Sequence, residues 1–366
     1  MKKRNTAAVI LLAVGIALMS SSLAIIYSYH PNRANPIDKA VADYFYLHNN
    51  KVVEEIMDVI SDLGEPFVYI GILTVLYYIW DKKLAYKGMV GVITSVVINS
   101  VAKSSFRLDK PNTNWGYDLV TTSYGLPSGH AQVSTSFWGL LAALFTKKWE
   151  DSDKNFSEIE NEIVEIKPTF WRVVGSFFKK WGMVILAIII PLLISFSRIY
   201  LGVHWFTDVT TGIGIGIVIF AIYILVEEPI GKFMENQSNW VKMAFVLLML
   251  IVFALPIILL QFNLGQKGIE NIFSDMNVIA LIVTISISYI WEEKLVNFNT
   301  AVDKKWKIFI RILFALALVG LYIAYDAIYD PDIITITKMV VDLIIYTILG
   351  PVMILLVPWI IKKLKV

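Results

Sequence analysis

Long runs of apolar residues constrain this chain more than any other feature of its sequence. The 366 residues include ten such runs, and each is about as long as the helix that crosses a hydrocarbon core of ~30 Å. Because irregular backbone cannot face lipid, each run must be helical. Only 17% of the residues are charged, against roughly 25% in a soluble domain. The sequence therefore predicts an all-α fold, a polytopic bundle of transmembrane helices.

The ten predicted spans divide into six and four. They are Ala7 to Tyr29, Pro66 to Trp80, Tyr86 to Val101, Ala131 to Phe145, Met183 to Tyr200, Phe206 to Val226, Met243 to Gln261, Met276 to Trp291, Ile308 to Tyr325 and Met339 to Ile361. We expect residues 1–236 to form one domain with six spans and residues 237–366 to form a transmembrane extension. The first run is longer than the apolar part of a secretory signal, which favours an uncleaved anchor.

The distribution of positive charge predicts the orientation of the chain. Short loops rich in Lys and Arg stay in the cytoplasm, and most of the 32 basic residues fall in such loops when the N-terminus is placed inside. We therefore expect both termini to be cytoplasmic. The basic residues are scattered along the chain, so we expect no nucleic-acid partner. The absence of cysteine excludes disulfides, thiol nucleophiles and cysteine metal sites.

An amphipathic segment separates the first two spans. Apolar residues recur at three-and-four spacing from Val41 to Leu63, after Pro36. This periodicity predicts one helix lying along the outer membrane interface.

Two of the four histidines lie at predicted outer ends of helices. His130 closes the sequence Pro127-Ser128-Gly129-His130, immediately before the span that begins at Ala131. Free backbone N–H groups and the positive end of the helix dipole at such a start attract an anion. Ser128 and Gly129 are therefore candidate phosphate-binding residues.

The second histidine, His204, has two charged neighbours in the sequence. Asp208 lies four positions later, so the two side chains can meet on one helix face. A carboxylate that accepts from one ring nitrogen leaves the other nitrogen suited to nucleophilic attack. Arg198, six residues before His204, can bind two phosphoryl oxygens through its planar guanidinium.

A cluster of cations precedes the first histidine motif. Lys103, Arg107 and Lys110 fall at the end of the third span and in the loop that follows, with Pro111 next. These positive charges would repel one another without an anion nearby, and a phosphate is the simplest common partner.

Together these motifs resemble the signature of the type-2 phosphatidic acid phosphatase superfamily, whose soluble relatives include vanadium haloperoxidases and bacterial acid phosphatases. That signature is Lys, six residues, Arg-Pro; then Pro-Ser-Gly-His; then Ser-Arg, five residues, His, three residues, Asp. The matching residues here are Lys103, Pro111, Pro127 to His130, Ser197, Arg198, His204 and Asp208. The chain departs from the signature at Lys110, where the family has Arg, and Arg107 is a candidate substitute for the missing guanidinium.

The resemblance implies a membrane lipid phosphatase with its site on the extracytoplasmic face. His204 would attack phosphorus with Asp208 holding its ring, and His130 would protonate the leaving oxygen and later activate water. Lys103, Lys110, Arg198, Ser128 and Gly129 would stabilise the phosphoryl charge. No metal or other cofactor is expected, and the expected partners are membrane lipids and a phosphorylated lipid substrate.

Several alternatives remain open. The same histidine could pass the phosphoryl group to another hydroxyl, which would make the protein a lipid phosphotransferase. An alternative from another functional class is a lipid-binding or transport protein that has the motifs but no catalytic turnover. Undecaprenyl pyrophosphate and the phosphatidic acid or phosphatidylglycerophosphate class fit the motifs equally well, because the motifs bind only the phosphate. The sequence leaves the oligomeric state and the role of residues 237–366 open.

Overall fold

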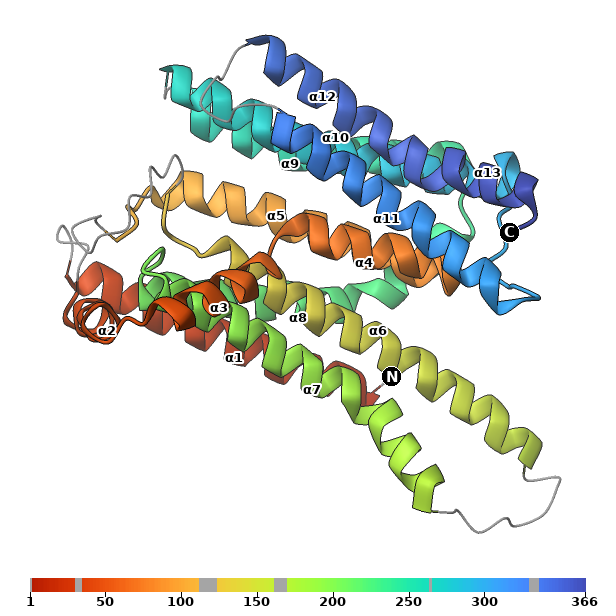
Figure 1. The fold of residues 1–366 in the computed structure, drawn as a ribbon, viewed down its shortest axis with the longest axis horizontal. Coiled ribbons are helices and arrows are strands. Elements are labelled where there is room, and N and C mark those ends of the chain that lie inside the picture. Colours follow the sequence, from red (N-terminus) through yellow and green to blue (C-terminus); the bar gives the residue numbers. More distant parts are fainter. Residues whose placement is uncertain (1, 30–34, 112–123, 161–169, 263–264, 329–335) are drawn as a thin grey trace. The chain divides into compact units, whose positions relative to one another are not determined.

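The structure, a computed structural model, describes residues 2–29, 35–111, 124–160, 170–262, 265–328 and 336–366. The regular elements within these ranges are all helical (Figure 1), so the predicted all-α membrane bundle is confirmed. In chain order they are α1 Lys2–Ser28, α2 Pro36–Leu47, α3 Lys51–Asp62, α4 Pro66–Ile79, α5 Lys82–Phe106, α6 Gly129–Glu160, α7 Phe170–Tyr200, α8 Phe206–Glu235, α9 Asn239–Gln261, α10 Gly265–Leu295, α11 Lys305–Ile328, α12 Ile336–Pro351, the π-helix η3 Val352–Leu356 and α13 Val357–Leu364.

Within the described residues, eight helices are long and apolar enough to cross a membrane. They correspond to eight of the ten predicted spans. The other two predicted spans are also helical, but α4 has only 14 residues and the N-terminal part of α6 carries polar side chains such as Gln132 and Ser134. The chain is therefore a multi-pass membrane protein.

The chain folds into two compact units, each made from two segments. The first contains residues 1–64 and 108–227, and the second contains residues 65–107 and 228–366. Helices α4 and α5 thus belong to the same compact unit as the C-terminal helices. The predicted functional boundary between residues 236 and 237 stays a prediction. The division by packing differs from it, because the second unit contains residues 65–107 as well as residues 228–366.

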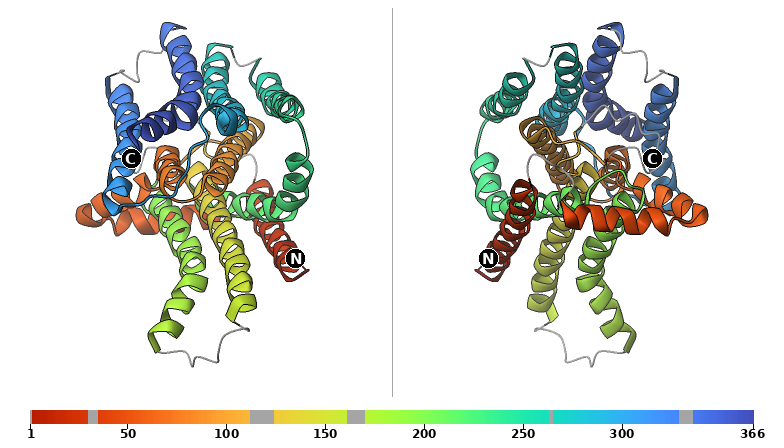
Figure 2. Two further views of the ribbon diagram at one scale, coloured as in Figure 1. Left: turned by 90° about the vertical axis from the view of Figure 1, so that its right-hand side faces the viewer. Right: turned by 90° about the vertical axis from the view of Figure 1, so that its left-hand side faces the viewer.

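In the first unit, α6 and α7 run side by side (Figures 1 and 2). Glycines of α8 set the distance between α8 and α6. A Cβ added to Gly212 of α8 would lie 2.7 Å from the backbone oxygen of Ser128, and one added to Gly216 would lie 2.7 Å from that of Gln132. Helices in membranes approach closely where small residues recur every four positions. This contact holds the start of α6 against the N-terminal part of α8.

The predicted amphipathic helix is two helices, α2 and α3, and the prediction of one continuous helix is wrong. The break is at Asn50, whose side chain accepts hydrogen bonds from the backbone N–H groups of Val52 and Val53, at 3.0 and 3.4 Å. An asparagine in this position satisfies the N–H groups that a helix start leaves unpaired. A new helix therefore begins although the apolar periodicity continues across the break.

In the second unit, α10 packs against α5, α9 and α12, and α4 packs against α5 and α11. Val97 of α5, Ile257 of α9 and Ile279 of α10 form a buried cluster. At the far end of α5 from Lys103, the Lys82 ammonium lies 2.7 Å from the Glu292 carboxylate of α10. Apolar packing and this ion pair hold α5 to the extension along its length.

Candidate active site

His204 and Asp208 meet at the start of α8. The Nδ1 atom of His204 lies 3.4 Å from Oδ2 of Asp208, and both side chains are buried, with Asp208 completely inaccessible. His204 precedes the first residue of α8, so the pair spans the helix start and does not share a helix face. The Asp208 carboxylate also accepts a hydrogen bond from the Trp205 N–H at 3.1 Å. Because Nδ1 faces the carboxylate, the nitrogen suited to attack a substrate is Nε2.

The backbone of the Pro-Ser-Gly-His motif is bonded directly to this loop. The Ser128 N–H donates to the Asp208 carbonyl oxygen at 3.1 Å. The Ser128 side chain is fully buried, and its Oγ has no hydrogen-bond partner among the described residues. Buried hydroxyl groups are normally hydrogen-bonded, so this oxygen is suited to an incoming anion. Gly129 follows as the first residue of α6.

His130, the second residue of α6, lies at the same end of the first unit. A Cβ added to Gly64 would lie 2.7 Å from Cδ2 of His130 and 2.8 Å from a side-chain carbon of Ile194. The imidazole therefore lies against the C-terminal end of α3, where only a glycine leaves enough room. No motif in the sequence marked Gly64.

Arg198 lies in the last turn of α7. One terminal guanidinium nitrogen donates a short hydrogen bond to the Ser61 Oγ of α3. Ser61 is buried, and the sequence analysis did not identify it because nothing in the amphipathic pattern of its helix distinguishes this serine. Ser61 fixes the guanidinium from the side of α3.

Lys110 lies close enough to Arg198 and Asp208 for both charges to affect it. Burial and then the Arg198 cation lower the pKa of Lys110 to about 8, and the Asp208 carboxylate opposes this shift. Two buried side chains whose positive charges repel each other are expected where an anion binds, because the anion stabilises both charges. Lys110 thus joins the cluster although it replaces the family's arginine.

Gly125 holds the Lys110 loop beside Asp208. Its N–H donates to the Leu108 carbonyl oxygen at 2.7 Å. A Cβ added to Gly125 would lie 2.9 Å from the Asp109 carbonyl oxygen and 3.0 Å from Oδ2 of Asp208. Only a glycine lets these two segments approach the carboxylate together.

Asp38 of α2 supports the loop from the other side. Its carboxylate accepts hydrogen bonds from the backbone N–H and the Oγ1 of Thr207, at 2.8 and 2.6 Å, and from the Asn35 side chain at 2.6 Å. All of these groups are buried. Thr207 stands between His204 and Asp208 in the sequence, so Asp38 fixes the backbone that carries the pair. This long-range contact has no signal in the local sequence.

Seven of the nine predicted site residues belong to the first unit, and the contacts above gather them at one end of it. They are Lys110, Ser128, Gly129, His130, Arg198, His204 and Asp208. The other two, Lys103 and Arg107, belong to the second unit. The Arg107 guanidinium donates to the carbonyl oxygens of Ser104 and Leu260, at 2.9 and 2.6 Å.

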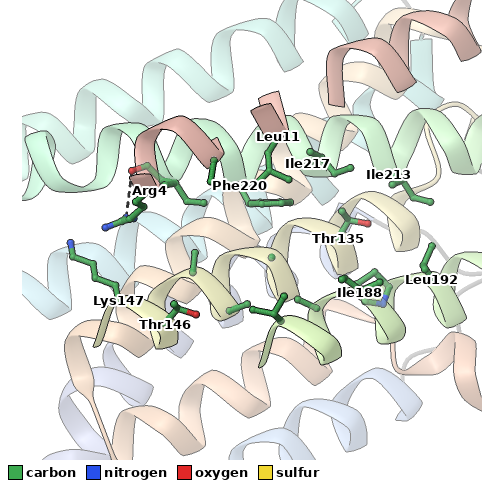
Figure 3. A pocket seen from close by; sticks show the side chains of 18 residues that line it. Arg4, Leu11, Thr135, Thr146, Lys147, Ile188, Leu192, Ile213, Ile217 and Phe220 are labelled. Carbon is green, nitrogen blue, oxygen red and sulfur yellow. Dashed lines mark hydrogen bonds between the residues drawn. The ribbon is translucent and has the colours of Figure 1, made fainter. Parts of the chain in front are cut away.

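An apolar cavity of about 830 Å³ lies within the first unit, between α1, α6, α7 and α8 (Figure 3). Thr135, Leu192 and Ile213 line one end. Arg4 and Lys147 line the other, where their side chains lie 3.1 and 2.8 Å from the Glu227 carboxylate. Thr135 comes five residues after His130 on α6 and Lys147 comes seventeen after it. At 1.5 Å per residue the cavity runs from roughly 7 to 25 Å beyond His130 along the helix.

Comparison with known proteins finds two matching family models. Residues 85–231 match the PAP2 superfamily, and residues 276–366 match the transmembrane extension of PAP2 superfamily phosphatases. Both models describe the same superfamily, and the first spans the motifs from Lys103 to Asp208.

Curated relatives are all phosphatases. Lipid phosphate phosphatase delta of Arabidopsis thaliana is 29% identical over 34% of this chain but only 26% of that protein. Phosphatidylglycerophosphatase B of Bacillus subtilis is 22% identical over 60% of this chain and 98% of that protein. Undecaprenyl-diphosphatase of Sulfolobus acidocaldarius is 26% identical over 48% of this chain and 73% of that protein.

One solved structure is also similar. The crystal structure of the first transmembrane PAP2 type phosphatidylglycerolphosphate phosphatase from Bacillus subtilis aligns with a TM-score of 0.44 and 23% identity, over 59% of this chain and 96% of that chain.

Proposed function

Since this chain belongs to the PAP2 superfamily, we propose that it is a membrane phosphatase that hydrolyses a lipid phosphate or pyrophosphate through a phosphohistidine. The observation that carries the proposal is the buried His204–Asp208 pair, with Nδ1 and Oδ2 3.4 Å apart, beside the cations of Lys110 and Arg198. A histidine held by a buried carboxylate next to an anion site is suited to nucleophilic attack on phosphorus.

In the first step, Nε2 of His204 attacks phosphorus in line with the lipid oxygen, and the bond from phosphorus to that oxygen breaks. The ring then carries a positive charge, which the Asp208 carboxylate stabilises through Nδ1–H. His130 gives its proton to the departing oxygen. The products of this step are the free lipid, or a lipid monophosphate if the substrate is a pyrophosphate, and a phosphohistidine.

In the second step, His130 is neutral and takes a proton from water, whose oxygen attacks phosphorus. The bond from phosphorus to Nε2 of His204 breaks, and inorganic phosphate leaves. Both steps pass charge through the three equatorial oxygens. Lys110, Arg198, the Ser128 hydroxyl and the Gly129 N–H stabilise that charge, and Lys103 supplies a further cation. The assignment of Arg107 to the same task stays a prediction.

The test is the release of phosphate by the purified protein from phosphatidic acid, phosphatidylglycerophosphate and undecaprenyl pyrophosphate. His204→Ala should lower turnover by at least roughly a thousandfold, as loss of a nucleophile does. His48→Ala is the matched control, because His48 is exposed and stacks on Tyr44. The variant His204→Ala with normal turnover contradicts the proposal. EDTA should leave the rate unchanged, because the cations replace a metal.

The same assay separates the rival functions. A phosphotransferase gives a new phosphoester in place of free phosphate, and a lipid-binding or transport protein gives neither product.

We place the site on the extracytoplasmic face, with both termini in the cytoplasm. In the first unit, Arg4 and Lys147 lie at the end of the bundle away from His130, as expected if basic residues remain inside. Because the chain has no cysteine, single cysteines can report this orientation. In intact cells, a membrane-impermeant maleimide should label Asn49→Cys and should not label Lys148→Cys. The reverse result contradicts the orientation.

The apolar cavity supports a long-chain substrate. One leaflet is about 15 Å thick, whereas the cavity extends to roughly 25 Å beyond His130 along α6. The acyl chains of a lipid whose phosphate lies at the site end near the middle of the membrane. A polyprenyl tail continues further, so the depth of the cavity favours a polyprenyl pyrophosphate over a diacyl lipid phosphate.

A further inference from the structure

The end of α5 that carries Lys103 is bonded to the C-terminal extension. Ser100, Lys103, Ser104 and Arg107 follow at three-and-four spacing, so the first three share one face of α5. Helices α9 and α10 pack against α5. The extension therefore contacts the first element of the phosphatase signature through defined polar groups, all within the second unit.

Gln261, the last residue of α9, links α5 to α10. Its Nε2 donates to the Ser104 Oγ at 2.9 Å and to Oδ2 of Asp275 at 2.9 Å. Gln261 and Ser104 are buried, at 1% and 5% exposure. Because both side chains are buried, breaking these hydrogen bonds would leave polar atoms unpaired and out of reach of water, so this bridge fixes the distance between the three helices.

Asp275 of α10 completes the bridge on the side of Lys103. Its carboxylate accepts a hydrogen bond from the Ser100 side chain and interacts electrostatically with the Lys103 ammonium. An ionisable side chain within a membrane span is costly unless it is paired, and such residues generally serve a function. The partners of Asp275 lie on α5 and α9, one turn or less from the cation that the signature assigns to phosphate.

Arg107 adds a second connection just beyond Lys103. The chain leaves α5 there with a positive φ of 51° at Arg107, and the guanidinium donates to the Leu260 carbonyl oxygen of α9 at 2.6 Å. The N–H of Arg107 donates to the carbonyl oxygen of Lys103 at 2.9 Å. Ser104 and Arg107 thus tie the end of α5 to the end of α9 just after Lys103, and Ser100 ties it to α10 just before Lys103.

We propose that Asp275 and Gln261 are positioning residues for phosphate binding. The extension uses them to fix the end of α5 and the position of the Lys103 ammonium, to which the proposed function assigns phosphate binding. This gives residues 237–366 a defined part in the reaction without any contact between the extension and the substrate. The inference rests on the proposed function, because it acts through Lys103.

A competing explanation is that this network only holds three helices together. A merely structural network would affect folding and the rate on every background, whereas a positioning network acts only while Lys103 is present. A double-mutant cycle separates the two cases, because residues that work through one group give non-additive effects.

The experiment compares Asp275→Asn, Lys103→Ala and the double variant of the full-length protein, with phosphate release and inhibition by orthovanadate as readouts. Asp275→Asn should lower kcat/KM by about 10- to 100-fold, the usual cost of a misplaced group, and weaken vanadate inhibition to a similar extent. On the Lys103→Ala background the same change should have no further effect. Asp275→Glu, which keeps the charge, should recover most of the loss.

The matched control is Asp342→Asn, a carboxylate elsewhere in the extension whose partner is the Tyr325 hydroxyl. It should leave kcat/KM and vanadate inhibition unchanged. Thermal unfolding of each variant reports any general loss of stability.

Each outcome decides between the possibilities. Normal kcat/KM in Asp275→Asn, or an equal further loss on the Lys103→Ala background, overturns the inference. If Asp275→Asn does not fold, Gln261→Glu takes its place as the perturbing variant in the same cycle. Absence of phosphate release from the wild-type protein contradicts the proposed function itself, and Lys103→Ala at full activity contradicts the role of Lys103 and with it the inference.

Discussion

Lys110 is the residue at which this chain departs from the family signature, and its surroundings explain what the departure changes. An arginine remains charged at every accessible pH, whereas a lysine can lose its proton when it is buried. Burial and Arg198 lower the pKa of Lys110 to about 8. The phosphate site therefore keeps its full charge only below that pH.

We predict that kcat/KM falls by about tenfold per pH unit above pH 8, because the free enzyme then loses one of its cations. Lys110→Arg should remove this alkaline limb and leave the acid limb in place. Profiles of kcat/KM against pH for the wild type and the variant provide the measurement. An alkaline limb that persists unchanged in Lys110→Arg would assign it to a different group.

The alkaline loss of activity is distinguishable from unfolding. Since the pKa of Lys110 is lower in the folded protein than the ordinary 10.5, the unfolded chain holds the extra proton between about pH 8 and 10.5. The contribution of Lys110 to the free energy of unfolding therefore rises with pH across that window. Activity and the stability contribution of this residue should change in opposite directions.

The site residues show how far local sequence can predict a site. His130, His204, Asp208 and Arg198 stand in short motifs whose chemistry is readable from spacing alone. Ser61 contacts Arg198, Gly64 lies against His130, and Asp38 binds Thr207 between His204 and Asp208. These three residues are far from the motifs in the sequence, and nothing in their own neighbourhoods identifies them. A local pattern encodes the reacting groups but not the groups that hold them.

At the scale of helices, the contact between α8 and the start of α6 brings the two histidine motifs together. Gly212 of α8 packs against the backbone of Ser128, because a Cβ added to Gly212 would lie 2.7 Å from the Ser128 carbonyl oxygen. A backbone oxygen cannot move out of the way by a change of rotamer, as the end of a flexible side chain can. A larger residue here must push α6 away from α8.

We predict that Gly212→Ala lowers kcat/KM by roughly 100-fold, because a shift of about 1 Å between the motifs misplaces the reacting groups. Gly231→Ala on the same helix is the control, since its added Cβ meets nothing within 4 Å. That change should keep activity and stabilise the helix by up to about 1 kcal/mol. Equal effects of the two substitutions on phosphate release would rule out the packing argument.

The helices themselves were predictable in part. Apolar runs located eight spans that the structure confirms, because burial in lipid demands length and apolarity together. The pattern did not reveal the break at Asn50, because a capping side chain interrupts a helix without changing the apolar period. Nor did it reveal that α4 and α5 pack with the C-terminal helices, since apolar side chains such as Val97 and Ile279 do not specify which partner they meet.

At the scale of the whole molecule, the protein combines a unit that carries both histidines with a unit that carries Lys103 and the C-terminal helices. The first unit also contains the apolar cavity, lined at its far end by Arg4 and Lys147. Neither the cavity nor the division into units follows from the motifs. Both depend on how helices from distant segments pack.

We predict that filling the cavity penalises long substrates selectively. Ala143 lines the cavity about 20 Å beyond His130 along α6. Ala143→Phe should lower kcat/KM for undecaprenyl pyrophosphate by roughly tenfold, the scale of a lost apolar pocket contact, and leave geranyl pyrophosphate unaffected. Equal changes in kcat/KM for the two substrates would show that the cavity does not hold the polyprenyl tail. That result would favour a lipid of the inner leaflet as the occupant of the cavity.

The central claim is that the phosphoryl group passes through His204, and trapping the phosphoenzyme tests it most directly. His130→Ala should slow water attack more than formation of the intermediate when the substrate is a lipid pyrophosphate, because the departing lipid monophosphate needs a proton less than a lipid alcohol does. Rapid quenching of this variant with labelled substrate, followed by mass spectrometry under alkaline conditions, should find phosphate on His204. Phosphate on a different residue would contradict the account. So would turnover by the wild type when no phosphohistidine can be trapped in the wild type or in His130→Ala.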